Sequence, residues 1–447
     1  MSNSASGYNM PVGYSGIRTL LRSYQFLKNP VSFVSRNMDI YGDTYTARLP
    51  GHKMILTRDA AFVNYVLKDN HTNYSKSSFT SGRLSEFLGK GMLFLNGENW
   101  LKQRRLIQPG FHREKIQTLY QLMIEVMDEY LSNFPSGGAI DVYPLMHQLA
   151  FNIVIKSLFD IELSPKTMQL LGANFNVIQN FVIKDINQPF RRAFYPFTRT
   201  DRRVLAKAAA IKTAFAGIIN ERKQSGKTYN DLLDMLLQSH YEDTGEPMTD
   251  EQVVDELLVF MFAGHETTAN TLSWVLYLLS VNKHVLNELA AHVTDMNVFD
   301  SVKSDYLNAV INEAMRLFPA AWLTDRVALQ DDNFGSYTYP KGTIIISFFY
   351  GVHRNKANWA DADVFNPHRF LDESGKLKKV KGFFPFGAGP RLWIGNNFAI
   401  AEMCFFLCKF FQSYTLMPAG HAPKLKPLLT LRPDRAVVNI QRVSNQI

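Results

Sequence analysis

Phe386-Gly-Ala-Gly389-Pro-Arg391-Leu-Trp393-Ile-Gly395 is the stretch of sequence that decides the fold. It holds three glycines within nine residues and precedes a helical pattern that runs from after Gly395 to about Ser413. Glycines at this density indicate a tight loop whose backbone comes close to another group. A phosphate cradle is not expected, because no clear strand precedes the loop and no Gly-Lys-Ser/Thr ending follows. Taken alone, the stretch predicts only a structural turn.

A second segment, Thr249 to Val281, is predicted to form one long helix. Thr249-Asp-Glu-Gln252 has the form of a capping box, and no proline interrupts the segment. Roughly thirty residues make a helix of about 48 Å, which is long enough to cross a whole protein.

The centre of this helix reads Ala263-Gly264-His265-Glu266-Thr267-Thr268. Small residues let a flat group approach the backbone, and Thr267 can bond back to a carbonyl one turn earlier. An acid beside an alcohol, here Glu266 and Thr267, could deliver protons to a bound ligand. The competing interpretation is a buried helix with a tolerated glycine and a salt-bridged glutamate, and this segment alone favours it.

Two further patterns are weak when taken separately. Glu313 and Arg316 have the i,i+3 spacing of a helical ion pair, which on a surface is worth a few tenths of a kcal/mol. Arg369 follows a proline turn in Phe365-Asn-Pro-His-Arg369-Phe370.

In this order and at these separations, the four segments resemble the cytochrome P-450 family of haem-thiolate monooxygenases. The resemblance covers nearly the whole chain and includes Trp100 and Arg104, a Trp-x-x-x-Arg pattern. It implies the cytochrome P-450 fold, which is mainly α with a small β portion, in a single large domain over residues 1–447. The expected β-rich parts lie near 44–57 and 327–349, and the long central helix at about 250–281.

Local signals agree with this fold class. Asn29-Pro30 predicts a helix start, and the helix should stop near Gly42. Other expected elements are strands at Thr44–Leu49 and Lys53–Thr57 joined by a Pro50-Gly51 turn, mostly helix from about Ala60 to Ala291, and a strand at Thr343–Phe349.

The resemblance also implies roles for single residues. Glu266 and Thr267 would be the catalytic acid–alcohol pair that protonates dioxygen. A buried structural triad would consist of Glu313, Arg316 and Arg369. The implied haem-binding residues are Trp100, Arg104, Gly264, Arg326, Phe386, Arg391, Trp393 and Gly395, of which Trp100, Arg104, Arg326 and Arg391 would hold the propionates.

Trp393 departs from the family, because it stands where the family carries its cysteine. That thiolate binds the iron and pushes electron density toward O–O cleavage. Indole offers only an N–H donor, so Trp393 cannot replace the ligand, and no protein metal ligand is predicted. The family implies heme b, and Trp393 opposes its binding.

The two cysteines, Cys404 and Cys408, lie eleven and fifteen residues after Trp393 on the expected helix. Eleven helical residues span roughly 16 Å, so neither thiol is expected to reach the iron. We interpret both as small core residues, because no histidine accompanies them as a metal site would require.

Three explanations of Trp393 stay open: a recent or engineered change in an ordinary monooxygenase, a haem-free helper scaffold, or a haem-free enzyme with acid–base or cyclisation chemistry. The first predicts monooxygenation of an apolar small molecule, impaired by loss of the thiolate; the other two form the alternative. Asp331-Asp332 and Asn230-Asp231-Leu-Leu-Asp234 do not fit the metal–diphosphate motifs of terpene cyclases.

Composition limits the setting. The chain has 447 residues, 46% of them hydrophobic, and a net charge of +8. Two cysteines exclude a disulfide framework and favour a reducing compartment. The N-terminus lacks the pattern of a signal peptide, and charges interrupt the most apolar stretch, so we expect a cytoplasmic protein without a membrane anchor.

Partner signals are less specific. Apolar segments at Phe79–Leu95 and Val177–Tyr195 suggest an apolar substrate. The basic and aromatic stretch Arg191–Arg203 carries no nucleic-acid motif, so nucleic acid is not expected. A separate ferredoxin or flavodoxin is the expected electron donor, and its basic docking residues would be Lys102, Arg105, Arg113, Lys376, Lys378, Lys379 and Lys381.

Overall fold

The structure is a computed structural model that describes residues 7–14, 24–49, 51–160 and 163–443. Pro50 of the predicted turn and the first six residues of the N-terminus lie outside the described residues. The chain divides into two compact units, so the prediction of one domain over 1–447 stays a prediction. The first unit holds residues 1–78, 312–393 and 425–432; the second holds 79–311, 394–424 and 433–447.

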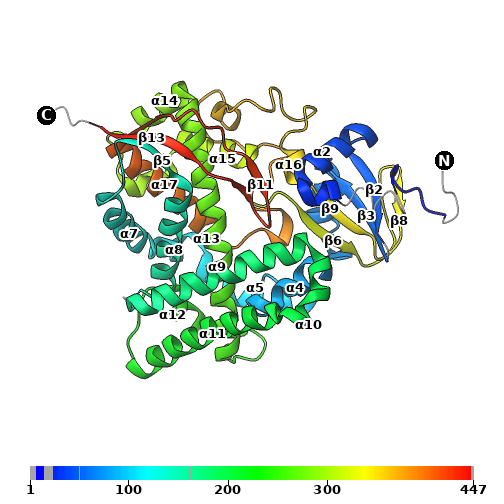
Figure 1. Cartoon of the computed structure of the whole chain (residues 1–447), viewed down its shortest axis with the longest axis horizontal. Helices are drawn as coiled ribbons and strands as arrows, with labels where there is room; N and C mark the ends of the chain where they lie inside the picture. The colour runs from blue at the N-terminus through cyan, green and yellow to red at the C-terminus, as the bar shows by residue number, and fades with distance from the viewer. Residues whose placement is uncertain (1–6, 15–23, 50, 161–162, 444–447) are drawn as a thin grey trace. The chain divides into compact units, whose positions relative to one another are not determined.

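A six-stranded sheet of order β1-β2-β3-β9-β6-β4 forms the centre of the first unit (Figure 1). β2 and β3 are antiparallel, with Thr44 opposite Thr57, whereas β3 and β9 are parallel. The elements are β1 Gly13–Tyr14, α2 Pro30–Tyr41, β2 Thr44–Leu49, β3 His52–Thr57, α3 Ala60–Asn64, η1 Tyr65–Asp69, η2 His71–Asn73, β4 Tyr74–Ser75, β6 Thr324–Ala328, β7 Asp332–Phe334, β8 Tyr337–Tyr339, β9 Ile344–Ser347, α16 Phe349–Val352, η6 Pro367–Phe370, η7 Gly389–Arg391 and β11 Leu425–Pro427.

Helices dominate the second unit, where α13 packs against α8, α11 and α17. α13 is an uninterrupted helix of 32 residues (Figure 1). The elements are α5 Gly97–Ile107, η3 Gln108–Phe111, α6 Arg113–Gln117, α7 Tyr120–Ser132, β5 Gly138–Asp141, α8 Val142–Phe159, α9 Pro165–Asn187, η4 Pro189–Phe194, α10 Tyr195–Thr198, α11 Thr200–Ser225, α12 Leu232–Leu237, α13 Asp250–Val281, α14 Lys283–Val293, η5 Val298–Lys303, α17 Asn396–Ser413, β10 Tyr414–Pro418 and β13 Val437–Arg442.

Three elements begin in one unit and end in the other: α4 Ser78–Leu88, α15 Asp305–Leu317 and β12 Leu431–Pro433.

The predicted fold class is confirmed: the described chain is mainly helical with a smaller share of strand. The Asn29 side chain caps α2, and Thr249 and Gln252 form the capping box of α13. α17 begins directly after Gly395 and ends at Ser413, as predicted. β3 begins one residue before the predicted strand, and the sheet of order β10-β13-β5 was not predicted.

Among the residues that the structure describes, no helix combines the length and the apolar character that crossing a bilayer requires.

Candidate functional site

The loop before α17 closes on itself through Trp393. The Trp393 backbone N–H donates to the Phe386 carbonyl at 3.1 Å, and the two rings lie 6.2 Å apart at 58°. Gly389 has φ +68°, and a Cβ there would lie 1.9 Å from the Leu67 carbonyl oxygen of η1. The group that the glycine-rich backbone approaches is therefore the backbone of η1 in the same unit.

A cluster of three cations lies beside this loop, formed by Lys76, Arg326 and Arg391. β4 and β6 are antiparallel, with Tyr74 opposite Ala328, so Lys76 follows β4 at the level of Arg326 on β6. Burial lowers the pKa of Lys76 to about 7, and Arg326 and Arg391 lower it further. Burial also lowers the pKa of Arg326 and of Arg391 to about 10 each. We call these three residues the cationic cluster; the sequence predicted two of them and missed Lys76.

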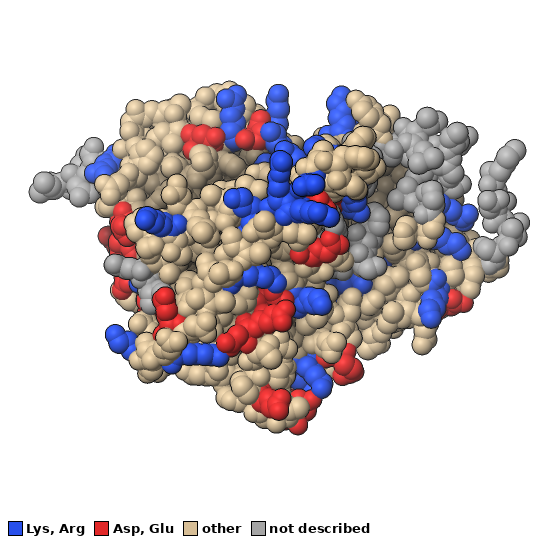
Figure 2. Space-filling view, turned by 60° about the horizontal axis from the view of Figure 1, so that its bottom comes forward, with Lys and Arg blue, Asp and Glu red and all other residues tan. Residues whose placement is uncertain are grey.

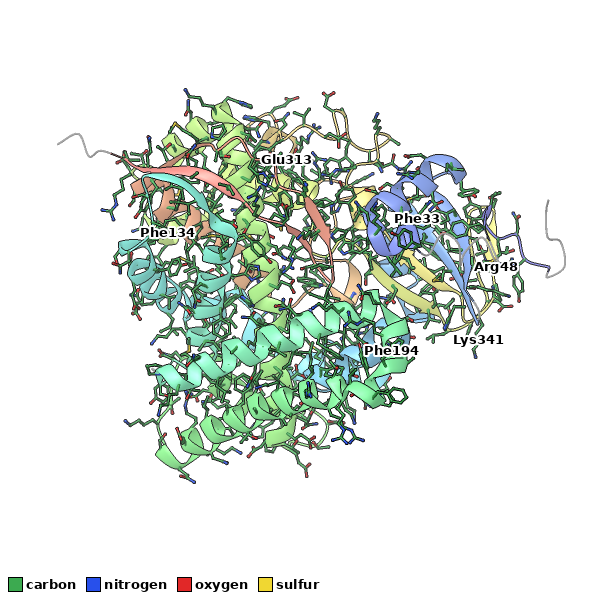
Figure 3. All side chains as sticks on the ribbon, viewed as in Figure 1. Phe33, Arg48, Phe134, Phe194, Glu313 and Lys341 are labelled. Carbon is green, nitrogen blue, oxygen red and sulfur yellow. The ribbon has the colours of Figure 1, made fainter. Side chains whose placement is uncertain are left out.

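The structure brings Glu313, Arg316 and Arg369 together in the core of the first unit (Figure 3 labels Glu313). Arg316 donates to both Glu313 oxygens, Nε at 2.7 Å and one terminal nitrogen at 2.8 Å. Its three remaining N–H groups donate to the carbonyls of His353, Ala362 and Val364. All five guanidinium donors are thus used, and the pair is fully buried rather than the surface pair that spacing alone allowed.

The centre of α13 has the predicted local geometry at Thr267. Its hydroxyl donates to the Ala263 carbonyl at 2.7 Å. A Cβ on Gly264, however, would lie 3.2 Å from the Val154 side chain of α8. The observed reason for a glycine is therefore the close packing of α8, and contact of Gly264 with a flat cofactor stays a prediction.

Buried polar groups surround the predicted acid–alcohol pair. Glu266 is 1% exposed. The His265 Nε2–H donates to the His147 carbonyl at 3.0 Å, and burial lowers the pKa of His265 to about 3, so its ring is neutral. Glu402 of α17, which the sequence did not single out, is fully buried beside Thr268. Burial raises the pKa of Glu402 well above its usual value, which favours the uncharged form of this carboxyl.

Trp100 and Arg104 both lie on α5 in the second unit. Arg104 Nε donates to Gln108 Oε1 at 3.0 Å, and burial lowers the pKa of the guanidinium. Their expected meeting with Arg326 and Arg391, which belong to the first unit, stays a prediction.

A family model described as Cytochrome P450 matches residues 16–440 of the chain. The chain belongs to the cytochrome P450 family. Cyclooctat-9-en-7-ol 5-monooxygenase of Streptomyces melanosporofaciens is 27% identical over 397 residues, which cover 88% of this chain and 86% of that protein. Cytochrome P450 72A15 of Arabidopsis thaliana is 31% identical over 383 residues, covering 78% and 72%.

The P450 fold is also shown by a solved structure. The crystal structure of cytochrome P450DA heme domain superposes with a TM-score of 0.86 at 24% identity, covering 97% of this chain and 98% of that one.

The family implies a haem, and the cationic cluster fits its acidic end. Arg326 lowers the pKa of both Lys76 and Arg391, and Asp325 offsets only part of this repulsion by raising the pKa of Lys76 and Arg326. An added anion would stabilise the three cations, because charge-assisted pairs with carboxylates are strong. Propionate carboxylates meet this requirement.

The iron of a P450 haem requires a thiolate ligand, and the described residues do not fit that requirement. Trp393 supplies no lone pair. Cys404 and Cys408 are buried in α17, as the core interpretation predicted, with sulfur atoms 4.0 Å from Asn308 Oδ1 and 3.9 Å from the Met296 carbonyl. Burial raises the pKa of both thiols, that of Cys408 to about 11, which disfavours a thiolate at either position.

The acidic motifs that do not fit the metal–diphosphate motifs of terpene cyclases are bound by other side chains of this protein. Arg222 binds both Asp231 and Asp234. Asp332 accepts hydrogen bonds from Tyr65, Asn70, Asn73 and Tyr74, and Asp331 accepts from Tyr8.

Surface charges of both signs alternate on the face that Figure 2 shows. Of the expected donor-docking residues, Lys102 pairs with Asp243.

Phe194 of η4, inside the basic and aromatic stretch, is 61% exposed (Figure 3).

Proposed function

We propose that this chain is a P450-fold protein that binds an apolar small molecule and the carboxylates of a haem, and that Trp393 impairs its monooxygenase activity. The observation that carries the proposal is the contrast within one loop. Arg391 contributes to a cationic cluster suited to carboxylates, whereas Trp393, two residues later, offers no electron pair to iron.

A haem with a thiolate ligand supplies oxygen activation in this family. The chain's own contribution would be the cationic cluster, which would hold the carboxylates, and the predicted acid–alcohol pair on α13, in which Glu266 is buried and Thr267 is partly buried. An apolar substrate is supported by the Streptomyces relative, whose name specifies an unsaturated alcohol as its substrate. A separate ferredoxin or flavodoxin donor and a cytoplasmic location are parts of the same proposal.

Haem content and the spectrum of the reduced carbon-monoxide complex test this function. We expect the purified full chain to lack the thiolate-type Soret band, whatever its haem content. That band at full occupancy would contradict the proposal. Trp393→Cys should produce the band with about one haem per chain.

Trp393→Ser is the matched control, because it removes the bulk of the indole without adding sulfur. We expect Trp393→Ser to take up haem without the thiolate-type band. Absence of haem in all three proteins would favour the alternative, a haem-free scaffold or non-redox enzyme.

A further inference from the structure

A tight turn at residues 89–92 docks on α13 through two adjacent carboxyl groups. The Lys90 backbone N–H donates to Asp255 Oδ2 at 2.7 Å, and the Met92 N–H donates to Glu256 Oε1 at 2.6 Å. Gly89 has φ +79°, and a Cβ there would lie 2.2 Å from Asp255 Oδ1. A Cβ on Gly91 would lie 2.9 Å from the Asp255 carbonyl oxygen. The Gly-Lys-Gly-Met sequence is therefore fitted to this contact, and we call residues 89–92 the docked turn.

The two carboxyl groups have different partners. Asp255 has a cation, because Lys212 of α11 donates to Oδ1 at 2.7 Å. Glu256 has only neutral donors: besides the Met92 N–H, the Gln103 amide of α5 donates to Oε1 at 3.0 Å. Glu256 Oε2 is buried without a hydrogen-bond partner among the described residues.

These partners decide the ionisation of Glu256. Burial raises its pKa to about 8, the Asp255 carboxylate raises it further, and the Met92 and Gln103 donors oppose the shift. At neutral pH the side chain is therefore mostly the uncharged acid, with Oε1 accepting two N–H groups and the proton on the otherwise unused Oε2.

Among the residues whose side chains the structure describes, the ionisable groups around Glu256 provide no counter-ion for it. Lys212 bonds Asp255, and the Tyr241 hydroxyl donates to Gln103 Oε1 at 2.8 Å. Lys102 forms an exposed ion pair with Asp243.

We propose that Glu256 is a proton-dependent anchor, which holds the docked turn on α13 while uncharged and releases it on ionisation. Release returns the Glu256 carboxylate to water and separates it from the amide groups of the turn. The turn belongs to the apolar segment 79–95, one of the two segments whose composition suggests an apolar substrate, so the anchor would place a pH-sensitive contact within that segment. The inference does not depend on haem binding.

The sign of the pH dependence follows from linkage. The docked state binds the Glu256 proton up to about pH 8, whereas in the released state the pKa returns toward its usual value of 4.5. Docking is therefore strongest below pH 4.5, weakens as the pH rises to about 8, and stays weak above it. Between pH 6 and pH 8 the equilibrium constant for release should rise roughly 50-fold.

Hydrogen exchange of the full chain, resolved to peptides that cover the docked turn, measures this release. Observed rates are divided by intrinsic rates at each pH, which leaves the protection factor. We expect the protection of the Lys90 and Met92 amides to fall about 50-fold from pH 6 to pH 8, while amides near Leu276 on α13 stay protected.

Glu256→Gln tests the cause, because an amide keeps the Oε1 acceptor and cannot ionise. Its protection should not change over the same pH range. Glu251→Gln, an exposed position on the same helix, should behave like the unmodified chain.

A flat profile in the unmodified chain, or an equal decline in Glu256→Gln, overturns the proposal. If Glu256→Gln does not fold, Asp255→Asn provides a second test. It removes the neighbouring negative charge and should make the decline smaller, and an undiminished decline counts against the proposal.

Discussion

Glu313 and Glu256 are both glutamates with almost no exposed surface, at 0% and 1%, yet their surroundings differ. Glu313 accepts from two guanidinium groups and from the Asn366 backbone N–H. Glu256 accepts from one backbone N–H and one side-chain amide. Both carboxyl groups are hydrogen-bonded, so hydrogen bonding alone does not distinguish them. The charge of the partner does: Glu313 belongs to a core that requires an anion, and Glu256 to a contact that requires a neutral acid.

The largest expected effect breaks the charged side of this comparison. Arg316→Ala removes five hydrogen bonds and leaves Glu313 buried with Arg369 as its remaining cation. Losing one partner of a buried ion pair costs about 3–5 kcal/mol, so we expect that loss in urea unfolding. Lys303→Ala, which breaks an exposed pair with Asp300, should change the free energy of unfolding by less than about 0.5 kcal/mol. A similar loss of unfolding free energy in both variants would show that the buried ion pair stabilises the fold no more than the exposed one.

Replacing each glutamate by its neutral isostere sharpens the comparison, because the two variants should differ in sign. At pH 8, Glu313→Gln should destabilise the fold by roughly 2 kcal/mol, whereas Glu256→Gln should stabilise it by roughly 4 kcal/mol. Because the pKa of Glu256 is raised in the folded state, the stability that this side chain contributes is fully present below pH 4.5. This stability is lost as the pH rises through about 8. The advantage of Glu256→Gln should therefore disappear by pH 5. Urea midpoints at both pH values measure this, and equal signs at pH 8 would refute the contrast.

Two glycines in the loop before α17 test the steric cost of adding a side chain. Gly387 and Gly389 both have positive φ, but only Gly389 approaches the Leu67 carbonyl. Alanine at either position should cost about 1 kcal/mol for its backbone conformation. Gly389→Ala should cost about 2 kcal/mol more, because its Cβ has to displace backbone atoms. Thermal unfolding compares the two, and an equal cost would show that η1 gives way easily.

The smallest expected effect concerns Lys76, a partly buried cation. Burial and two arginines lower the pKa of Lys76 to about 7, so its charged form weakens the fold below pH 7, and stability should rise between pH 7 and pH 10.5. Lys76→Met should stabilise the haem-free chain by about 1 kcal/mol at pH 6 and weaken its affinity for a dicarboxylate porphyrin. Urea unfolding measures the stability, and titration with the porphyrin measures the affinity. An unchanged affinity would show that Lys76 does not help to bind the carboxylates.

Elements whose ends depend on neighbouring residues could be predicted from the sequence. The Asn29 cap, the capping box at Thr249 and the start of α17 after Gly395 are local signals, and all three are confirmed. β5 could not be predicted in this way, because its four residues become a strand only by pairing with β13, almost 300 residues later.

The site shows the same division between local and distant information. Arg326 and Arg391 were predicted through a family resemblance. Lys76 carries no motif, and only the pairing of β4 with β6 brings it to Arg326. Asp255 and Glu256 are charged residues inside an apolar run of the sequence, and the backbone N–H groups that dock on them cannot be recognised from residue types. Their side-chain partners, Lys212 and Gln103, come from distant helices.

Because α13 is one uninterrupted helix, it determines how ionisation of Glu256 can affect the predicted catalytic residues on the same helix. Glu256 and Glu266 lie ten residues apart on this one helix, about 15 Å along its axis. A proton cannot be transferred directly between two side chains over this distance. A regular helix of this length is also rigid. Ionisation of Glu256 can therefore influence the second half of α13 through its electrostatic field or through the movement of residues 89–92, and not by direct proton transfer.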